Sequence, residues 1–175
     1  AAAHQSGAAP ITWGTPVAVR TGAGNSVDVS TQGTLVEAFN AAISSYTGGN
    51  KTVNGVTFVA TTNLLPLNAT TVNDFSAATN GGDANYDAIL STADYGGGES
   101  TTIIIGDGDG NSSVNGAGLL EIGRRYQIQV WFVDDRSSSN ARTMGFASTS
   151  SAAKVNLNDQ HVTGTFTADA TTQTL

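Results

Sequence analysis

The amino-acid sequence predicts an all-β protein, an antiparallel β-sandwich in which one sheet edge is incomplete. Two observations predict this class: apolar and polar residues alternate wherever the sequence shows a period, and clusters of Gly, Asn, Asp and Ser separate the alternating runs. With 175 residues the chain also has the length of a single β-sandwich with its own core. We therefore expect one domain over residues 11–175, preceded by a tail or donor segment over residues 1–10.

Ten short strands are expected along the chain. They span residues 11–13, 16–20, 34–41, 53–61, 101–105, 126–133, 143–147, 154–157, 162–168 and 171–175. The clearest is 126–133, because its even-numbered residues are apolar and its other face begins with Gln127 and Gln129. We expect this strand to lie in the centre of a sheet.

The C-terminal stretch, residues 162–175, is expected to form a β hairpin. Val162 and Phe166 fall on one face of its first strand, whereas the other face carries threonines. Asp169 and Ala170 are expected to turn the chain into the last strand, which ends on Leu175. No closing strand follows, so we expect an open sheet edge there that needs a partner.

Some stretches allow more than one structure or none. Residues 35–43 fit a helical period as well as a strand, and residues 85–93 are compatible with a short helix. Long loops are expected at residues 63–85 and 106–117, where turn-forming residues crowd together and no period survives.

The composition excludes several classes of partner. Charged residues make up 12% of the chain, against roughly 25% in an average soluble domain, so Thr, Ser, Asn and Gly supply the polar surface. The net charge is −7 and the seven Lys and Arg residues are scattered, which argues against nucleic acid and anionic membranes as partners. No apolar stretch approaches the ~20 residues that span a bilayer, so no membrane insertion is expected.

The first ten residues, AAAHQSGAAP, are rich in the small side chains that signal peptidase leaves behind. We therefore expect a secreted protein that is extracellular or lies at the cell surface. Because the chain has no cysteine, its stability has to come from packing and sheet hydrogen bonds.

The sequence predicts no enzyme. Asp134 and Asp135 are adjacent, and in a continued strand they would point to opposite faces, so they could not flank one glycosidic bond. The chain has two histidines, His4 and His161, and lacks a Gly-x-Ser-x-Gly motif. Nothing in the sequence points to an acid, a base and a nucleophile at one place.

The same acidic pair has a second interpretation, as part of a ligand-binding loop. Asp134, Asp135 and Arg136 end a strand, and Trp131 precedes them. Trp131, like Trp13, either offers its ring to a sugar or is buried in the core.

A calcium site is the one cofactor hypothesis that the sequence supports. Asp107, Asp109 and Asn111 supply oxygen ligands at every second position, as in a calcium loop. The twelfth position of that loop is Gly118, and Glu121 is the nearest carboxylate. The alternative is a solvated turn rich in Asp and Asn, and neither interpretation makes a cofactor necessary for the fold.

Three Asn-x-Ser/Thr sequons make glycosylation a further hypothesis. They begin at Asn50, Asn68 and Asn111. Chance also produces such triplets in a chain so rich in Asn and Thr.

Five stretches carry a resemblance to a known group of proteins. They read ITWG (11–14), VDVSTQGTLVEA (27–38), VNGVTF (53–58), YQIQVWFVDDR (126–136) and GTFTAD (164–169). Together they resemble a family of secreted β-sandwich domains in surface and exported proteins of aquatic bacteria. The resemblance covers nearly the whole chain from Ile11 onward, and it implies a jelly-roll-like sandwich in the style of carbohydrate-binding modules.

Two departures from that family imply how copies could associate. Members carry one further strand after the Thr-Ala-Asp stretch, whereas this chain ends at Leu175 and has ten residues before Ile11. An unfilled strand position and a surplus segment imply strand complementation between copies, a head-to-tail contact that propagates into a filament. Subunit contacts are then expected at Ala1, Ala2, Ala3, Ile11, Trp13 and Leu175.

The expected function is therefore structural. The chain would be the subunit of an extracellular filament or pilus-like fibre, with other copies of itself as partners. The alternative is a non-catalytic carbohydrate-binding module of a secreted or surface protein, with glycans as partners.

Overall fold

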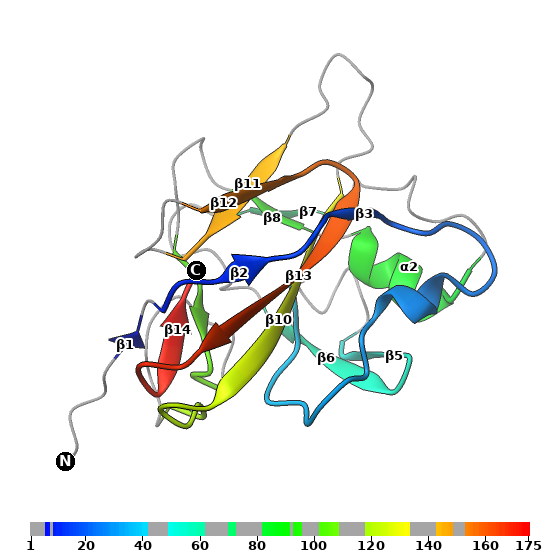
Figure 1. Ribbon diagram of the computed structural model, residues 1–175. Helices are drawn as coiled ribbons and strands as arrows, with labels where there is room; N and C mark the ends of the chain where they lie inside the picture. Colours follow the sequence, from blue (N-terminus) through cyan, green and yellow to red (C-terminus); the bar gives the residue numbers. More distant parts are fainter. Residues whose placement is uncertain are drawn as a thin grey trace.

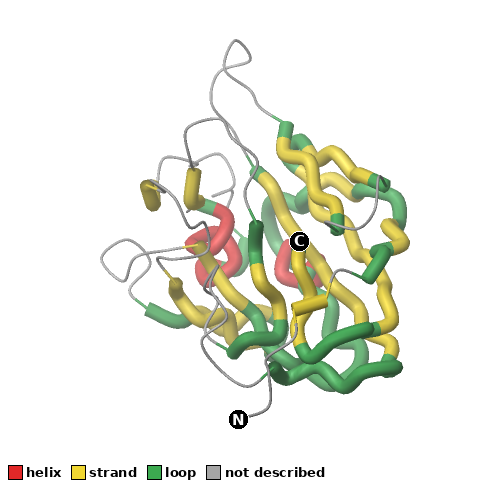
Figure 2. The backbone as a smooth tube through the Cα atoms, turned by 90° about the vertical axis from the view of Figure 1, so that its left-hand side faces the viewer, coloured by secondary structure: helices red, strands yellow, loops and turns green. Residues whose placement is uncertain are grey.

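A computed structural model describes residues 6–7, 9–41, 49–61, 70–72, 82–91, 93–95, 102–108, 118–133, 143–148 and 153–175. Strands, mostly antiparallel, make up most of the regular structure there, which confirms the predicted all-β class (Figure 1). Figure 2 shows the helical segments as short insertions among the strands. Among these residues, no helix is long and apolar enough to cross a membrane.

The largest sheet is built around β13 (Gln160–Thr167). Strand β10 (Arg125–Phe132) pairs with it antiparallel over eight residues, from Arg125 opposite Thr167 to Phe132 opposite Gln160. Strands β2 (Thr12–Trp13) and β3 (Val17–Ala18) pair with its other edge. The central position expected for 126–133 is therefore wrong: within the described residues, β10 pairs with β13 alone, and β13 is the central strand.

A second sheet holds the C-terminal strand, β14 (Thr172–Thr174). Strand β1 (Ser6–Gly7) lies parallel to β14 on one side, and β9 (Ile104–Ile105) lies antiparallel on the other. The expected open edge at this strand is wrong, because the N-terminal part of the same chain occupies it.

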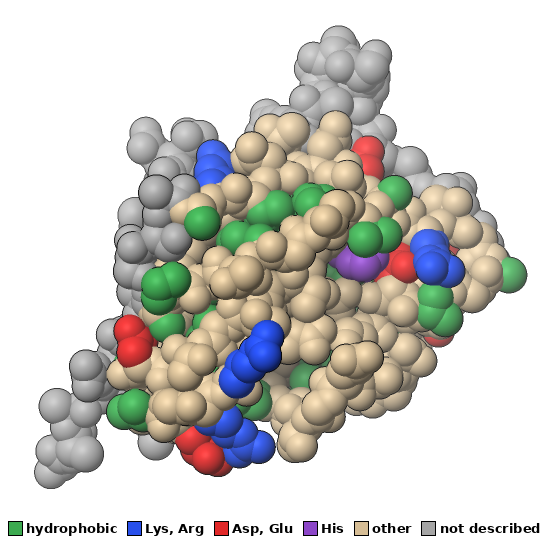
Figure 3. All heavy atoms as spheres, viewed as in Figure 1, with side chains coloured by type: hydrophobic (Ala, Val, Ile, Leu, Met, Phe, Trp, Pro, Cys, Tyr) green, Lys and Arg blue, Asp and Glu red, His purple; other side chains and the backbone are tan. Residues whose placement is uncertain are grey.

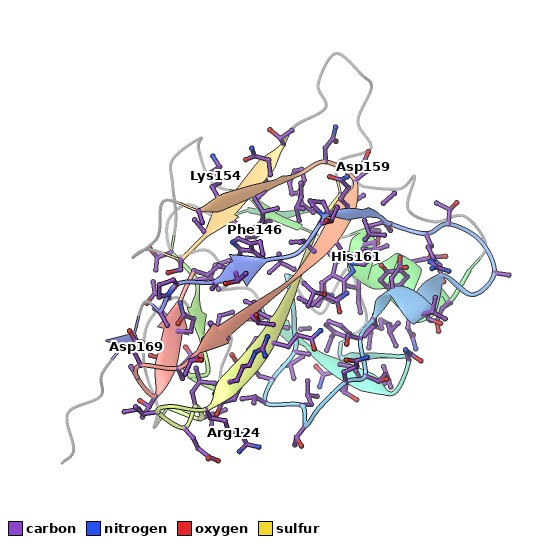
Figure 4. All side chains as sticks on the ribbon, in the orientation of Figure 1. Arg124, Phe146, Lys154, Asp159, His161 and Asp169 are labelled. Atoms are coloured by element: carbon purple, nitrogen blue, oxygen red, sulfur yellow. The ribbon has the colours of Figure 1, made fainter. Side chains whose placement is uncertain are left out.

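The predicted hairpin over residues 162–175 is also wrong. The ladder of β13 continues beyond its end, since the Ala168 amide donates to Arg124 and its carbonyl accepts from Gly123. The chain then bends at Asp169 (Figure 4), and β14 joins the other sheet. Alternation identified both strands, but β14 pairs with β1 and β9 and not with β13.

Three further sheets complete the described structure. Strand β6 (Val56–Thr61) lies between β4 (Phe39–Ala41), which is parallel to it, and β5 (Lys51–Val53). The pair β11 (Met144–Ala147) and β12 (Lys154–Leu157) forms a second antiparallel sheet, and β7 (Thr70–Val72) with β8 (Ala93–Tyr95) forms the third.

These sheets correct three predicted elements. Residues 53–61 are a hairpin arm with its turn at Asn54 and Gly55, whose φ angles of 48° and 79° suit the tight turn that Asn-Gly favours. In the predicted strand 34–41, the structure has a strand at Phe39–Ala41 only. The loop predicted at 63–85 contains β7.

Two helical segments flank the sheets. The short helix expected over 85–93 is confirmed as α2 (Ala84–Leu90), whose first turn is capped by Asp83 accepting from the amides of Asn85 and Tyr86. The 3-10 helix η1 (Asn25–Asp28) precedes it in the chain.

Hydrophobic side chains pack against both faces of the large sheet. Even-numbered residues of β10 and β13, such as Ile128 and Phe166, pack with Ile11 and Leu175. On the odd-numbered face, Trp131 packs with a cluster supplied by β5, β6 and α2. The remaining odd-numbered residues form a polar face, as the threonines of 162–168 predict.

Candidate functional site

A buried carboxylate, Asp28 at the end of η1, organises the polar side of the large sheet. Its side chain is 2% exposed, and its Oδ1 lies 3.1 Å from Nε of Arg20. Oδ2 accepts from the Arg20 amide at 2.8 Å and from the Tyr86 hydroxyl at 3.3 Å. Because both oxygens are paired, the charge is compensated where water is excluded.

Tyr86 connects this carboxylate to the core. Its hydroxyl accepts from Nε1 of Trp131 at 3.1 Å, and the Trp131 ring meets Phe58 edge-on with centroids 5.9 Å apart. Burial, and then the negative charge of Asp28, raises the pKa of Tyr86, so the phenol stays protonated. The partly buried indole of Trp131 is therefore anchored against the core, and its role as a ligand contact stays a prediction.

His161 is the third member of this cluster, on the part of β13 that faces η1 (Figure 4). Its Nδ1 lies 3.2 Å from Nε2 of Gln129, and its Nε2 lies 3.7 Å from Oδ1 of Asp28. Burial lowers the pKa of His161 despite the opposing influence of Asp28. The cluster of Asp28, Tyr86 and His161 joins η1, α2 and β13, an arrangement that suits structural support.

An open hollow of about 420 Å³ lies beside this cluster. The loop after η1 forms one wall, and the odd-numbered residues of β10 and β13 form the floor. We call it the amide hollow, after its amide and hydroxyl side chains Ser30, Asn54, Gln127, Gln129 and Thr163.

A second hollow of about 360 Å³ follows on the same face of the sheet, and we call it the arginine hollow. It is lined by Thr12, Arg125 and Thr165. Figure 3 shows mainly neutral side chains and backbone over β10 and β13, with few charged groups.

The N-terminal segment, which we define as residues 6–7 and 9–14, connects the large sheet to the sheet that holds β14. It supplies β1 and β2, and its Ala9 and Ile11 are buried at 3% and 2% exposure. The Gln173 side chain, itself buried in β14, donates to the Ala9 carbonyl at 3.0 Å.

Among the expected subunit contacts, Ile11, Trp13 and Leu175 meet in one core cluster. They meet within a single chain in this structure, and their contact with a neighbouring copy stays a prediction. Ala1, Ala2 and Ala3 lie outside the described residues.

The expected calcium ligands are described in part. Asp107 is buried at 5% exposure in a turn whose Gly106 and Gly108 amides donate to the Glu37 carboxylate. Glu121 is exposed and pairs with Arg124 at 2.8 Å. Asp109 and Asn111 lie outside the described residues, within which no three His, Cys, Asp or Glu side chains are grouped to hold a metal. Calcium binding stays a prediction.

The glycosylation and ligand candidates are likewise described in part. Asn50 is exposed, and its side-chain oxygen accepts from the Ala60 amide at 3.1 Å. Asn68 and Asn111 lie outside the described residues, and so do the ligand candidates Asp134, Asp135 and Arg136.

The sequence analysis missed the cluster around Asp28. Its members come from distant segments, and no spacing links them. Asp28 stands between Val27 and Val29, and this local sequence does not distinguish a buried carboxylate from an exposed one.

Comparisons of the chain with protein-family models, with curated proteins and with solved structures found no match.

Proposed function

We propose that the chain is a non-catalytic structural subunit of an extracellular filament, assembled head-to-tail through the N-terminal segment. The observation that carries this proposal is the position of that segment, which pairs with β13 and β14 and buries Ala9 and Ile11. The segment comes from one end of the chain and its partners from the other.

Such a segment can be exchanged between copies. Residues 9–14 would make the same contacts with β13 and β14 of a neighbour as with those of their own chain, so exchange changes few interactions. Since each copy would give one segment and receive one, the contact is heterologous and continues into a filament unless it closes a ring.

The proposal includes the finer architecture and the location. The sheets of β10–β13–β2 and β1–β14–β9 both contribute to the core around Ile11 and Phe166, which supports a jelly-roll-like sandwich. That architecture accords with the secreted β-sandwich domains that the sequence resembles. We accordingly place the protein outside the cell.

A pair of engineered cysteines tests the exchange, because the chain has no cysteine of its own. Thr12 and Thr165 are antiparallel partners and line the same hollow. The Cα atoms of such partners lie about 4.5–5.5 Å apart, which suits a disulfide. Oxidised Thr12→Cys/Thr165→Cys filaments should run as a covalent ladder on a non-reducing gel.

The matched control is Gln127→Cys/Thr165→Cys, which joins β10 to β13 and should always give a monomer band. Electron microscopy of the same samples establishes whether filaments form. Filaments with only a monomer band would overturn the exchange of the segment. Absence of filaments at every concentration would overturn the structural function itself.

A second candidate function, a non-catalytic carbohydrate-binding module, is favoured by one observation. The exposed part of the odd-numbered face of β10 and β13 carries two hollows lined mainly by neutral polar side chains. Hydroxyl and carboxamide groups are suitable partners for sugar hydroxyls.

A further inference from the structure

We propose that the odd-numbered face of β10 and β13 is the binding site of a neutral polysaccharide chain, which would lie along the two strands from the amide hollow to the arginine hollow. This inference rests on the second candidate function and is independent of filament assembly. We call this face the polar track.

The register of the strands makes the track continuous. Gln129 is paired with Thr163 and Gln127 with Thr165, so the amide hollow is followed directly by the arginine hollow. Residues two apart on a strand are separated by about 7 Å, and the paired length of eight residues is about 26 Å. A ligand that fills both hollows is therefore a chain of several units.

The polar groups of the track match a polyhydroxyl ligand. Within the described residues, no donor reaches Oε1 of Gln127 or Oδ1 of Asn54. The hydroxyls of Ser30 and Thr163 can both donate and accept. Sugar hydroxyls, which also do both, would satisfy these groups together.

The charges of the track favour a neutral ligand. Among the described residues that line the two hollows, Arg125 is the only cationic side chain, and an anionic polymer would need several. Asp28 is the only acidic one, and its carboxylate is 2% exposed and paired with Arg20. Neither an acidic nor a basic polymer therefore finds complementary charge.

The wall of the amide hollow is held in place before any ligand arrives. Nε2 of Gln129 donates to the Asp28 carbonyl at 2.7 Å, and Oε1 accepts from the Ser30 amide at 3.0 Å. Asn54 donates to the Val29 carbonyl at 2.8 Å, which fixes the other side of the same loop. Such preorganisation lowers the entropy cost of binding.

Weak binding by a single copy is expected, because among the described residues no Trp or Tyr lines either hollow, and Phe166, which lines the second, is buried in the core. Trp131 packs on Phe58, and Tyr126 stacks on Phe166 on the other face of the sheet. A method that detects weak binding is therefore required. Saturation-transfer NMR is suitable, because it observes the signals of the ligand and therefore works for both monomers and filaments.

The probes are the neutral oligosaccharides cellohexaose, xylohexaose, mannohexaose and maltohexaose, with tetragalacturonate as the acidic comparison. We expect saturation transfer to at least one neutral probe with the unmodified chain. The variants Gln127→Leu and Thr163→Val each remove one hydrogen-bonding group, so we expect each to bind that probe about three- to tenfold more weakly. Gln127 is exposed, so its variant should keep the fold. The matched controls Gln160→Leu and Thr57→Val, which lie off the track, should bind like the unmodified chain.

The possible results distinguish a failure of the proposed site from a failure of the carbohydrate-binding function. Binding that persists unchanged in both track variants would overturn the site and leave the carbohydrate-binding function in place. Saturation of none of the neutral probes would overturn both. Stronger binding of tetragalacturonate would overturn the neutral class of ligand.

Discussion

The hydroxyl of Tyr86 donates a hydrogen bond to Oδ2 of Asp28 over 3.3 Å, although the two residues are 58 positions apart in the chain. The same hydroxyl accepts from the indole of Trp131. One atom therefore joins α2, η1 and β10. The polar track owes the position of its wall to this contact, since the loop after η1 begins at Asp28.

Replacing Tyr86 by Phe should lower the free energy of unfolding by about 1–3 kcal/mol. The change leaves Nε1 of Trp131 without its acceptor and takes one donor from Asp28. Urea unfolding followed by tryptophan fluorescence measures the loss. Tyr126→Phe is the control, because that hydroxyl accepts from the exposed Glu121 amide, and it should cost less. Equal losses in the two variants would contradict a special role for Tyr86.

His161 should make stability depend on pH. Its pKa is lowered in the folded protein, so the unfolded chain binds the proton more tightly. The stability that depends on neutral His161 is fully present above the pKa of histidine in the unfolded chain, about 6.5. It is lost as the pH falls below that value. Urea unfolding of the parent chain between pH 7.5 and about 5 should show this decrease, and His161→Gln should show less of it. An identical pH dependence in the variant would assign the effect to other groups.

Gly164→Ala should loosen the N-terminal segment. A Cβ at this position would lie 2.6 Å from Cγ2 of Ile11 and 2.7 Å from the Trp13 ring, so the segment would have to move. We expect a loss of about 1–3 kcal/mol in stability. We also expect faster hydrogen exchange of the Gly14 amide, which donates to the Thr163 carbonyl.

The matched variant for that experiment is Thr165→Ala, on the same strand and also opposite the segment. It removes side-chain atoms without adding any, so the Gly14 amide should keep most of its protection. Equal acceleration of exchange in both variants would show that the close approach at Gly164 does not hold the segment.

The sequence predicted strands better than it predicted their partners. The alternation of apolar and polar residues predicted the bounds of Lys154–Leu157 and the polar face of β13. Such alternation depends only on which side of a single strand is buried. The partners of β14 are β1 and β9, and pairing at such separations leaves no local pattern. The strand expected over 53–61 ran through Asn54 and Gly55, although that dipeptide is a hairpin signal in its own right and could have indicated the turn.

The candidate site was harder to predict for the same reason. Asp28, Tyr86 and His161 lie on three separate elements and meet only after the sheets have packed. The polar track could be predicted in part, because the threonines of β13 and the glutamines of β10 both follow a period of two. Their position side by side required the register of the two strands.

Glu37 supports the turn that carries Asp107, and its replacement by Gln should weaken that turn. The carboxylate accepts from the amides of Gly106 and Gly108, whose φ angles are both 86° and whose amides can thus surround an anion. Loss of the charge should cost about 1–2 kcal/mol in urea unfolding, because hydrogen bonds to a charged acceptor are the stronger kind. Glu121→Gln breaks only the exposed pair with Arg124 and should cost about 0.5 kcal/mol or less. If both variants lose the same stability, the anion-binding turn contributes no more than a surface ion pair.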